Sequence, residues 1–486
     1  MYRFRQMFEK VIEYFNTQEE INMQKKQMID ILNAALATGG DYAELFFEDR
    51  IDQTIMIETD QTAAADTVNT FGCGVRILKE NSCVYGYTND CSYKSVKSLA
   101  EKLSASFKGE RILEVSELKT VKSPGLNRIK VPYESVDMKE QIAFMKEAAA
   151  AAMAVDEKIT RCDISYNHHT QKVTIANSKG RLVKDTRTRG RARITPVAVK
   201  PGSIQPFFTG PGASKGYDFF TEDIDVKAMA EEAAKAAVIM LDAVDCPSGE
   251  MPVIIDNAFG GVLFHEACGH SLEASSVAKG LSVFSGKKGQ KIASDIFNAF
   301  DDGTIDNAWG SENFDDEGNR TQNKQLIKDG ILVEYMIDDF NGRLMGKEGN
   351  GSCRRESYKY CPTSRMSNTF IGNGNSTKEE IFAATKFGLY AKTMGGGSVN
   401  PATGEFNFAV NEGYLIEDGK ITKPVKGATL IGNGGDILFN VDMIANNLTR
   451  GEGMCGAASG SIPTDVGQPT IRLSSILVGG TGGKLK

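Results

Sequence analysis

Two hydrophobic periodicities alternate along the first half of this 486-residue chain. Apolar residues recur every three or four positions in five segments, which predicts helices at residues 1–26, 28–40, 95–107, 138–157 and 223–244. Short runs rich in β-branched and aromatic residues predict strands at residues 42–49, 53–60, 74–80, 83–89, 159–167, 172–178, 181–189 and 192–200. Residues 177–180, Asn-Ser-Lys-Gly, have the composition of a hairpin turn. The first half therefore has the pattern of an α+β domain with an antiparallel sheet.

The pattern changes near residue 247. The sequence CPSG at residues 246–249 ends the last predicted helix, and the chain beyond it is rich in glycine, with many short strands separated by turn residues. We therefore predict a mainly β domain with long functional loops at residues 247–486 and the α+β domain at residues 27–246. Residues 1–26 form a predicted N-terminal extension helix, which packs on its own domain or binds a partner.

Composition and charge exclude several classes of protein. The 63 acidic residues exceed the 56 basic ones, the net charge is -7 and there is no basic tract, so we expect no direct binding to nucleic acid. No segment has the roughly 18 to 20 uninterrupted apolar residues of a membrane helix. The nine cysteines are an odd number without paired spacing, and the first residues lack the apolar core of a signal peptide. We therefore expect no disulfide framework and a cytoplasmic location.

The stretch FHEACGHSLEAS, residues 264–275, contains the strongest candidate chemistry. His265 and His270 are two of only four histidines, and Glu266 directly follows the first. In the common H-E-x-x-H arrangement the histidines are four apart and differ by about 40° around a helix, so both reach one metal ion. Histidines five apart differ by about 140° on a regular helix and diverge. Their convergence would require a π-bulge, for which Gly269 offers the least steric hindrance.

Two interpretations of this stretch remain open from the residues alone. In the structural one, a helix carries two ordinary histidines and a solvated glutamate. In the functional one, His265 and His270 bind Zn²⁺, and Glu266 is the general base that activates water for hydrolysis of an amide. A catalytic zinc needs a third protein ligand, and the residues leave Cys268, Glu273 and Cys455 as candidates.

Other polar clusters have weaker interpretations. His168 and His169 are adjacent on a predicted strand, point in opposite directions and are expected on the surface. Arginines at alternating positions 187, 189, 191 and 193 share one strand face, which we interpret as solvated rather than as a surface that binds a peptide or a partner. The sequence CRRESY at residues 353–358 indicates either substrate binding by Arg354, Arg355 and Glu356 or an internal ion pair.

HEACGHSLE resembles the HExxxH signature of the TldD/PmbA family, zinc metallopeptidases that were also called modulators of DNA gyrase. The resemblance extends over residues 28–480 and includes the segments DYAELFFED, GCGVRILKE, TQNKQLIKDGIL, NGRLMG, RRESY, RMSNTF, MGGGSVNPATGEF and MCG with VGQPTIRL. Within the family, TldD-like subunits carry the zinc motif and PmbA-like subunits, also called TldE, lack it. This chain is similar to the TldD-like subunits.

The resemblance implies a ligand set of His265, His270 and Cys455 for Zn²⁺, with Glu266 as the catalytic base. It also implies a mixed α/β N-terminal half, a mainly β C-terminal half and a dimer around an enclosed chamber. The second subunit is either another copy or a motif-lacking PmbA/TldE-like chain. Unfolded or leader-type peptides are the implied substrates, held as an added strand at a sheet edge.

Two further expectations depend on this resemblance. It favours Gly395, Gly396 and Gly397 as backbone that lines a peptide groove, where the alternative is a flexible turn. The competing function is a non-catalytic scaffold or peptide-binding subunit of the same family that holds a structural metal. We favour the enzyme, because a scaffold does not need Glu266.

Overall fold

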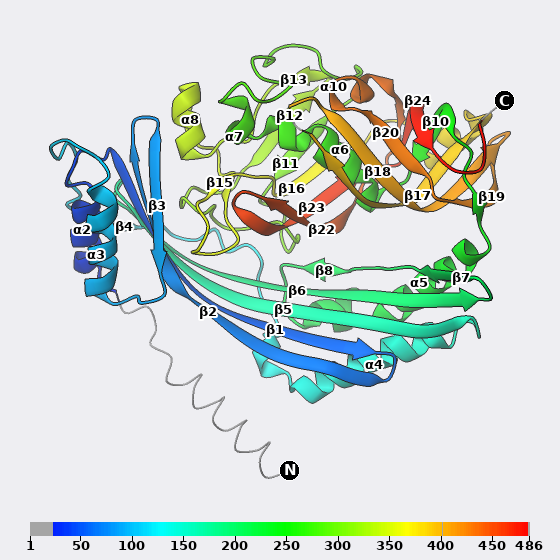
Figure 1. Ribbon diagram of the computed structural model, residues 1–486, viewed down its shortest axis with the longest axis horizontal. Helices are drawn as coiled ribbons and strands as arrows, with labels where there is room; N and C mark the ends of the chain where they lie inside the picture. Colours follow the sequence, from blue (N-terminus) through cyan, green and yellow to red (C-terminus); the bar gives the residue numbers. More distant parts are fainter. Residues whose placement is uncertain (1–22, 401, 485–486) are drawn as a thin grey trace, which may run out of the picture.

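The computed structural model describes residues 23–400 and 402–484, which form two halves packed against each other (Figure 1). The prediction of an α+β fold with antiparallel sheets is confirmed. The predicted extension helix at residues 1–26 falls outside the described residues, except for residues 23–26. Among the described residues, no helix is long and apolar enough to cross a membrane.

One long curved sheet forms the base of the N-terminal half (Figure 1). Its strands follow the order β3-β2-β1-β5-β6-β4, with β7 and β8 paired to β6. All neighbours are antiparallel except β4 and β6. The strands are β1 (Tyr42–Glu58), β2 (Gln61–Lys79), β3 (Ser82–Thr88), β4 (Lys119–Thr120), β5 (Ile159–Asn177), β6 (Arg181–Lys200), β7 (Ser203–Pro206) and β8 (Gly212–Ala213).

The strands of this sheet are longer than the sequence predicts. Pairs of predicted short strands join into β1, β5 and β6, which have 17, 19 and 20 residues. The polar residues that interrupt the apolar pattern do not end the strands, because their side chains form hydrogen bonds with side chains of the neighbouring strand. For example, the amide of Gln171 in β5 donates to the carboxylate of Glu48 in β1 at 2.7 Å. The predicted turn after Asn177 is confirmed, and Gly180 takes a left-handed φ of 76° there.

The two faces of the sheet have different neighbours, because successive side chains on a strand point to opposite sides. On one face, Leu45 packs with α2 and α3, and Ile55 packs with α4 and α5. On the other face, Phe46 packs against Phe314 of the C-terminal half. The four helices are α2 (Lys25–Ala35), α3 (Tyr93–Ser104), α4 (Met138–Met153) and α5 (Val226–Leu241).

The C-terminal half contains two larger sheets with the short helix α6 (Val262–Ala267) among them (Figure 1). The first sheet consists of β9 (Val244–Asp245), β10 (Gly249–Ile255), β17 (Phe387–Val399), β18 (Glu405–Glu417), β19 (Lys420–Lys426), β20 (Thr429–Asn433), β21 (Val441–Ile444) and β24 (Ile471–Gly479). Its strands follow the order β17-β10-β24-β20-β18-β19-β9, and β21 pairs with β24. The second, in the order β13-β12-β11-β16-β23-β22, consists of β11 (Ala299–Asp302), β12 (Asn323–Lys328), β13 (Ile331–Leu332), β16 (Asn368–Ile371), β22 (Thr449–Ala457) and β23 (Gly460–Gln468).

Smaller elements complete this half. They are α7 (Ala274–Val277), α8 (Asp339–Met345), α9 (Lys378–Ala383), α10 (Gly434–Ile437) and the strand pair β14 (Cys353–Arg354) and β15 (Thr363–Ser364). Buried apolar residues from both sheets and from α6 form one continuous core. This core fixes the position of α6, which carries the first half of the candidate metal motif.

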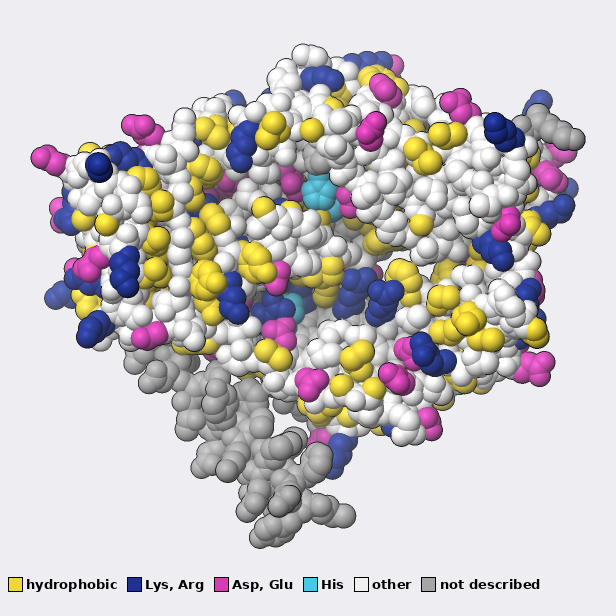
Figure 2. All heavy atoms as spheres, viewed as in Figure 1, with side chains coloured by type: hydrophobic (Ala, Val, Ile, Leu, Met, Phe, Trp, Pro, Cys, Tyr) yellow, Lys and Arg dark blue, Asp and Glu magenta, His cyan; other side chains and the backbone are white. Residues whose placement is uncertain are grey.

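Buried ion pairs lie where the two halves meet, and we call them the interface ion-pair cluster. They include Arg76 with Glu317 (2.5 Å) and Glu44 (2.7 Å), Arg187 with Asp316 (2.8 Å), Arg189 and Arg354 with Glu312 (3.0 and 3.2 Å) and Arg355 with Glu44 (2.6 Å). All of these side chains are almost fully buried. Figure 2 shows the molecule hollowed between the sheet and the C-terminal half, with basic and acidic side chains gathered along the hollow.

The interface ion-pair cluster corrects the prediction of a solvated arginine face. Arg187 and Arg189 are buried against the C-terminal half, and Arg191 donates to the carbonyl of Glu452 at 2.7 Å. Of the four arginines, only Arg193 is exposed, with its guanidinium 4.3 Å from the ring centre of Phe208. A strand face of alternating charges looks the same in sequence whether water or protein covers it, and here three of its four arginines bond to the C-terminal half.

Candidate metal centre

Glycines let the motif helix begin directly against the second sheet. The buried strand β10 leads through the short 3-10 helix η3 (Ala258–Gly261) into α6. A Cβ atom on Gly261 would lie 2.4 Å from the backbone nitrogen of Gly467 in β23, so only glycine fits at this position. Because β23 pairs with β22, this close approach brings the start of α6 next to the strand that carries Cys455.

The helix is broken between the two histidines, although not by the predicted π-bulge. Helix α6 ends at Ala267, Cys268 has φ -129° and ψ -46°, and a 3-10 turn, η4 (Gly269–Leu272), carries His270. The distortion is therefore centred on Cys268. Gly269 contributes space, because a Cβ atom there would lie 2.4 Å from the sulfur of Met366. The predicted convergence of the rings does occur, by a break and a change of helix type.

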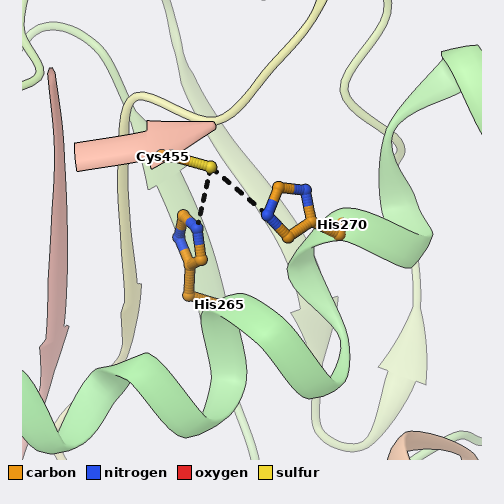
Figure 3. Close-up of side chains that lie close together, drawn as sticks. All are labelled: His265, His270 and Cys455. Carbon is orange, nitrogen blue, oxygen red and sulfur yellow. Dashed lines mark hydrogen bonds between the residues drawn. The ribbon is translucent and has the colours of Figure 1, made fainter. Parts of the chain in front are cut away.

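Three side chains that are far apart in sequence meet at one point (Figure 3). The Sγ atom of Cys455 lies 3.3 Å from Nε2 of His265 and 3.2 Å from Nε2 of His270. The ligand atoms of all three residues lie within 4.8 Å of one another. His265 and Cys455 are buried, and His270 is partly exposed. One metal ion at the centre of this group could reach all three donors.

The other candidate ligands do not join this group. Cys268 is fully buried in the hydrophobic core, where burial raises the pKa of its thiol well above the usual range. Glu273 has one carboxylate oxygen 3.3 Å from Nδ1 of His270, the ring nitrogen that faces away from Cys455. Carboxylates in this place orient the imidazole ligands of metal sites.

Electrostatics favour the metal-binding form of Cys455. Burial raises the pKa of the thiol, but the positive charge of His265 and hydrogen bonds from His265 and His270 outweigh it and lower the pKa to about 3. Burial lowers the pKa of His270, whereas Glu273 and Cys455 raise it well above the usual value. A thiolate is the form of cysteine that binds metals, and the two rings beside it can bind the same ion once they release their protons.

Glu266 lies beside the donor group at the wall of a cavity. Its Oε2 atom is 3.8 Å from Nε2 of His270, and 21% of its side chain is exposed. Glu266, His270 and Cys455 all line this cavity, which has a volume of about 770 Å³. A carboxylate in this position can exchange a proton with a molecule bound in the cavity.

Arg365 is a residue of this region that the sequence prediction missed. Its buried guanidinium donates to the carbonyl of Gly460 and to the hydroxyl of Ser459, both at 3.0 Å, and to the carbonyl of Cys455 at 2.5 Å. These bonds hold the β22–β23 hairpin, and with it Cys455, in place. No periodicity or spacing marks Arg365, because its partners lie about 90 residues away in sequence.

Of the three glycines in MGGGSV, only Gly397 lines the same cavity, together with Ser398 and Val399. The pairing of β17 with β18 is irregular between Met394 and Gly397. A Cβ atom on Gly397 would collide with the ring of Phe408 at 2.1 Å, whereas one on Gly396 would meet nothing within 4 Å. The structure thus separates Gly397 from Gly395 and Gly396, which lie outside the cavity lining.

The prediction that the remaining two histidines lie on the surface is wrong. His168 is buried and stacks on Tyr133, with the ring centres 4.3 Å apart. Burial lowers the pKa of His168 to about 4. His169 points to the other side of the sheet, 4.0 Å from Asp52, and is only partly exposed. Both lie in the N-terminal sheet and do not contribute to the donor group.

The arginines of CRRESY form internal ion pairs, which was one of the two open interpretations. Arg354 and Arg355 belong to the interface ion-pair cluster. Glu356 accepts a hydrogen bond from the backbone of Ser461 at 2.7 Å. Arg355 therefore joins the two halves, whereas Arg354 and Glu356 bond to β23 and its hairpin within the C-terminal half.

A second group of possible ligands, Glu317, Asp338 and Cys353, is fully buried. Its oxygens already have protein partners: Glu317 pairs with Arg76 and accepts from the backbone of Asp339 at 2.8 Å. Asp338 accepts from Asn341. Because hydrogen bonds from the protein already occupy these oxygens, this group belongs to the packing between the halves.

Comparison with known proteins identifies the family. Three family models for PmbA/TldA metallopeptidases match in succession: domain 1 at residues 43–107, the central domain at residues 131–241 and the C-terminal domain at residues 248–480. The chain belongs to the PmbA/TldA metallopeptidase family. The resemblance to the TldD/PmbA family is thereby confirmed.

Individual members of the PmbA/TldA family agree with this assignment over nearly the whole chain. A Haemophilus influenzae protein named metalloprotease TldD homolog is 36% identical over 468 residues, which cover 95% of this chain and 97% of that protein. A Saccharolobus solfataricus protein named zinc metalloprotease TldD homolog is 23% identical, and the match covers 93% of this chain and 100% of that protein. The crystal structure of TldE from Thermococcus kodakarensis has the same fold, with a TM-score of 0.75 and 18% identity. The match covers 93% of this chain and 99% of that chain.

Proposed function

We propose that this chain is a zinc-dependent metallopeptidase, in which His265, His270 and Cys455 hold Zn²⁺ and Glu266 is the catalytic base. The observation that carries the proposal is the convergence of three ligand atoms within 4.8 Å beside a carboxylate that faces a cavity. Relatives named metalloproteases, one of them a zinc metalloprotease, support the same function.

The donor set fits zinc. Two imidazole nitrogens and one thiolate are ligands that zinc prefers, and three protein ligands leave a fourth position open for chemistry. Bound Zn²⁺ supplies a Lewis acid that polarises a carbonyl and lowers the pKa of an attacking water to about 7. Glu273 keeps the ring of His270 oriented, so that Nε2 faces the centre. Arg365 keeps the backbone of Cys455 in place.

Glu266 performs the proton transfers of the proposed reaction. Its carboxylate accepts a proton from the water that attacks the peptide carbonyl and later donates it to the departing amine. The position of Glu266 next to His270, at the cavity wall, lets it reach both the water and the scissile bond. The reaction is the hydrolysis of a peptide bond.

The substrate we propose is an unfolded or leader-type peptide bound in extended form. Gly397, Ser398 and Val399 pair with β18 on one side and line the cavity. Among the described residues, β10 pairs only with residues 389–391 of β17, so this end of β17 has no strand on its other edge. A peptide can add to such an edge through main-chain hydrogen bonds, with its scissile bond near Glu266.

The decisive experiment compares Glu266→Gln with Glu379→Gln, a matched change at an exposed glutamate of α9. We expect Glu266→Gln to keep its zinc but to lose about 10²- to 10⁴-fold in the cleavage rate of an unfolded peptide. Glu379→Gln should cleave at the wild-type rate. If Glu266→Gln also cleaved at the wild-type rate, the proposed mechanism would be wrong.

Chelation separates the enzyme from a scaffold with a structural metal. An open catalytic site predicts that a chelator abolishes cleavage and leaves the circular dichroism spectrum of the folded chain intact. A structural metal predicts unfolding on chelation, because its binding energy is part of the folding energy. The two outcomes exclude each other.

We propose a dimeric assembly in the cytoplasm, formed either with a second copy or with a motif-lacking TldE-like chain. The structural similarity to TldE supports a subunit of this shape. All nine cysteines lie within the described residues as free thiols, which suits a reducing compartment. Light scattering on the purified chain, alone and mixed with a TldE-like relative, distinguishes the two kinds of dimer.

A further inference from the structure

Two thiols from different halves of the molecule meet in the candidate substrate cavity. Cys83 lies in β3, the edge strand of the N-terminal sheet, and Cys361 lies in the segment before β15. Their sulfur atoms are 3.9 Å apart. Both side chains are partly exposed and line the cavity of about 770 Å³ that Glu266 and His270 also line. Figure 1 shows the raised end of β3 beside β15.

The segments that carry the two thiols are already in contact, so a bond between the sulfurs requires no movement of one half against the other. The hydroxyl of Tyr85, two residues after Cys83, donates to the carbonyl of Tyr358 at 2.5 Å. A disulfide needs a sulfur separation of about 2.05 Å, which is close enough to 3.9 Å for side-chain rotation and small backbone shifts to supply the difference.

The two thiols differ in reactivity. A hydrogen bond from Cys83 lowers the pKa of Cys361, burial raises it, and the positive Arg76 and Arg355 lower it again, to about 7 in total. The same hydrogen bond and burial raise the pKa of Cys83. Cys361 therefore supplies the thiolate that attacks, and Cys83 supplies the thiol that follows.

The other cysteines lack this combination of exposure and proximity. Cys73, Cys162, Cys246, Cys268, Cys353 and Cys455 are buried. Cys455 lines the same cavity, but its sulfur contacts the ring nitrogens of His265 and His270 rather than a second thiol. Cys91 is partly buried like Cys83, but burial raises its pKa to about 12. Oxidation should therefore select the pair in the cavity.

We propose that Cys83 and Cys361 are a modification site for low-molecular-weight disulfides such as oxidised glutathione, and that they close into a disulfide across the cavity. The thiolate of Cys361 attacks one sulfur of oxidised glutathione, the sulfur–sulfur bond breaks, and one glutathione thiolate leaves and takes up a proton. The sulfur of Cys83 then loses its proton to solvent, attacks the Cys361 sulfur and displaces the second glutathione. Two protein thiols are oxidised, and one oxidised glutathione is reduced to two glutathione thiols.

The second step becomes easier after the first. In the mixed disulfide, Cys361 no longer carries the negative charge whose hydrogen bond is the largest cause of the raised pKa of Cys83. The Cys83 sulfur therefore ionises more readily once Cys361 has reacted. Proximity also favours closure, because the attacking sulfur is already in van der Waals contact with its target.

The disulfide would act on the metal centre through a short segment. Only three residues separate Cys361 from Arg365, which donates to the carbonyl of Cys455. Tying β3 to this segment narrows the cavity between the halves and restrains their separation. We therefore expect slower peptide cleavage in the oxidised protein, an effect that depends on the proposed peptidase function.

The test uses the full-length purified chain with oxidised glutathione, followed by alkylation of free thiols and mass spectrometry of non-reduced peptides. In the wild type we expect one cross-linked pair of peptides that contains Cys83 and Cys361, and its loss on treatment with dithiothreitol. Cys83→Ser should accumulate glutathione on Cys361, whereas Cys361→Ser should form neither product. Cys91→Ser is the matched control and should react as the wild type does.

The covalent result does not depend on peptidase activity, so it separates this proposal from the proposed function. Absence of the Cys83–Cys361 cross-link in the wild type, or equal glutathione incorporation in Cys361→Ser and the wild type, would overturn it. A second readout compares the cleavage rate of each variant with its own untreated rate. Oxidation should lower the rate of the wild type and of Cys91→Ser reversibly, and leave the rate of Cys361→Ser unchanged.

Discussion

The candidate metal centre and the interface ion-pair cluster both bury ionisable side chains, but they balance charge differently. In the cluster, carboxylates and guanidinium groups alternate: Glu44 accepts from Arg76 at 2.7 Å and from Arg355 at 2.6 Å. In the centre, the sulfur of Cys455 and the Nε2 atoms of His265 and His270 all face one point, and each can bind a metal ion once it has lost its proton. The cluster is complete without any further ion, whereas the centre has the donors for one.

This difference separates structural from functional burial of charge. A buried charge is tolerated when a partner neutralises it, and the removal of one partner is then more costly than the removal of both. Two imidazole nitrogens and a cysteine sulfur that face one point instead match the ligand set of a metal ion.

The largest effect is expected at the centre. Cys455→Ser removes one of the three proposed zinc ligands, so we expect the zinc content to fall from near one ion per chain to almost none. The loss of metal affinity should exceed the about 10- to 100-fold that follows from removing a residue that only orients a ligand. Cys268→Ser is the matched control and should keep its zinc, because Cys268 lies in the hydrophobic core. Atomic absorption on both variants measures the difference. Equal zinc in the two variants would contradict the assignment of Cys455.

A smaller effect is expected when the interface ion-pair cluster loses a partner. Arg76→Met leaves Glu317 buried without its guanidinium, and we expect the free energy of unfolding to fall by about 3–5 kcal/mol. The double variant Arg76→Met with Glu317→Gln should recover part of this loss, because neither buried charge of the pair remains. Urea unfolding measures both.

The matched control for Arg76→Met is Lys235→Met, at an exposed ion pair with Glu232. We expect no measurable change in stability there, since exposed pairs contribute little. A loss in Lys235→Met as large as in Arg76→Met would show that burial does not decide the effect. Zinc content should stay at the wild-type level in all of these variants.

The smallest effect is a dependence of stability on pH that arises from the interface ion-pair cluster. Burial raises the pKa of Glu312, but Arg187, Arg354 and Arg189 outweigh it and lower the pKa from 4.5 to about 2. The unfolded chain therefore binds a proton at higher pH than the folded chain does. The stabilisation by this carboxylate is complete above about pH 4.5 and is lost as the pH falls towards 2.

Urea unfolding at a series of pH values measures this dependence. Glu312→Gln should be less stable than the wild type near pH 6 and should show a shallower decline between pH 4.5 and 2. A decline as steep in Glu312→Gln as in the wild type would assign the acid sensitivity to other carboxylates.

Much of the local structure could be predicted from the sequence, because it depends on nearby residues. Apolar spacing placed the helices α2 to α5, and the residues Asn177 to Gly180 placed the hairpin between β5 and β6. Strand lengths were underestimated, because polar residues in the middle of β1, β5 and β6 looked like ends of strands. Partners that join β1 to β5, such as Gln171 and Glu48, lie more than 100 residues apart and leave no local signal.

Contacts between residues far apart in sequence also limited what could be predicted about the candidate sites. Spacing showed that His265 and His270 could meet only if the helix were distorted, but the core around Cys268 decided that the distortion is a break followed by a 3-10 turn. The resemblance to a family was needed to select Cys455 as the third ligand. The pair of Cys83 and Cys361, 278 residues apart, has no sequence pattern at all.

By itself, the sequence determined which donors this protein has, that they include an HExxxH motif, and which segments form helices and strands. These properties follow from side-chain chemistry and from the periods of 3.6 and 2 residues. The tertiary structure alone decided which distant groups share one space: Cys455 beside two histidines up to 190 residues away, and arginines of β6 against acidic loops of the other half. Long-range packing sets these contacts, because the topology of the sheets brings together residues that have no local relation in the chain.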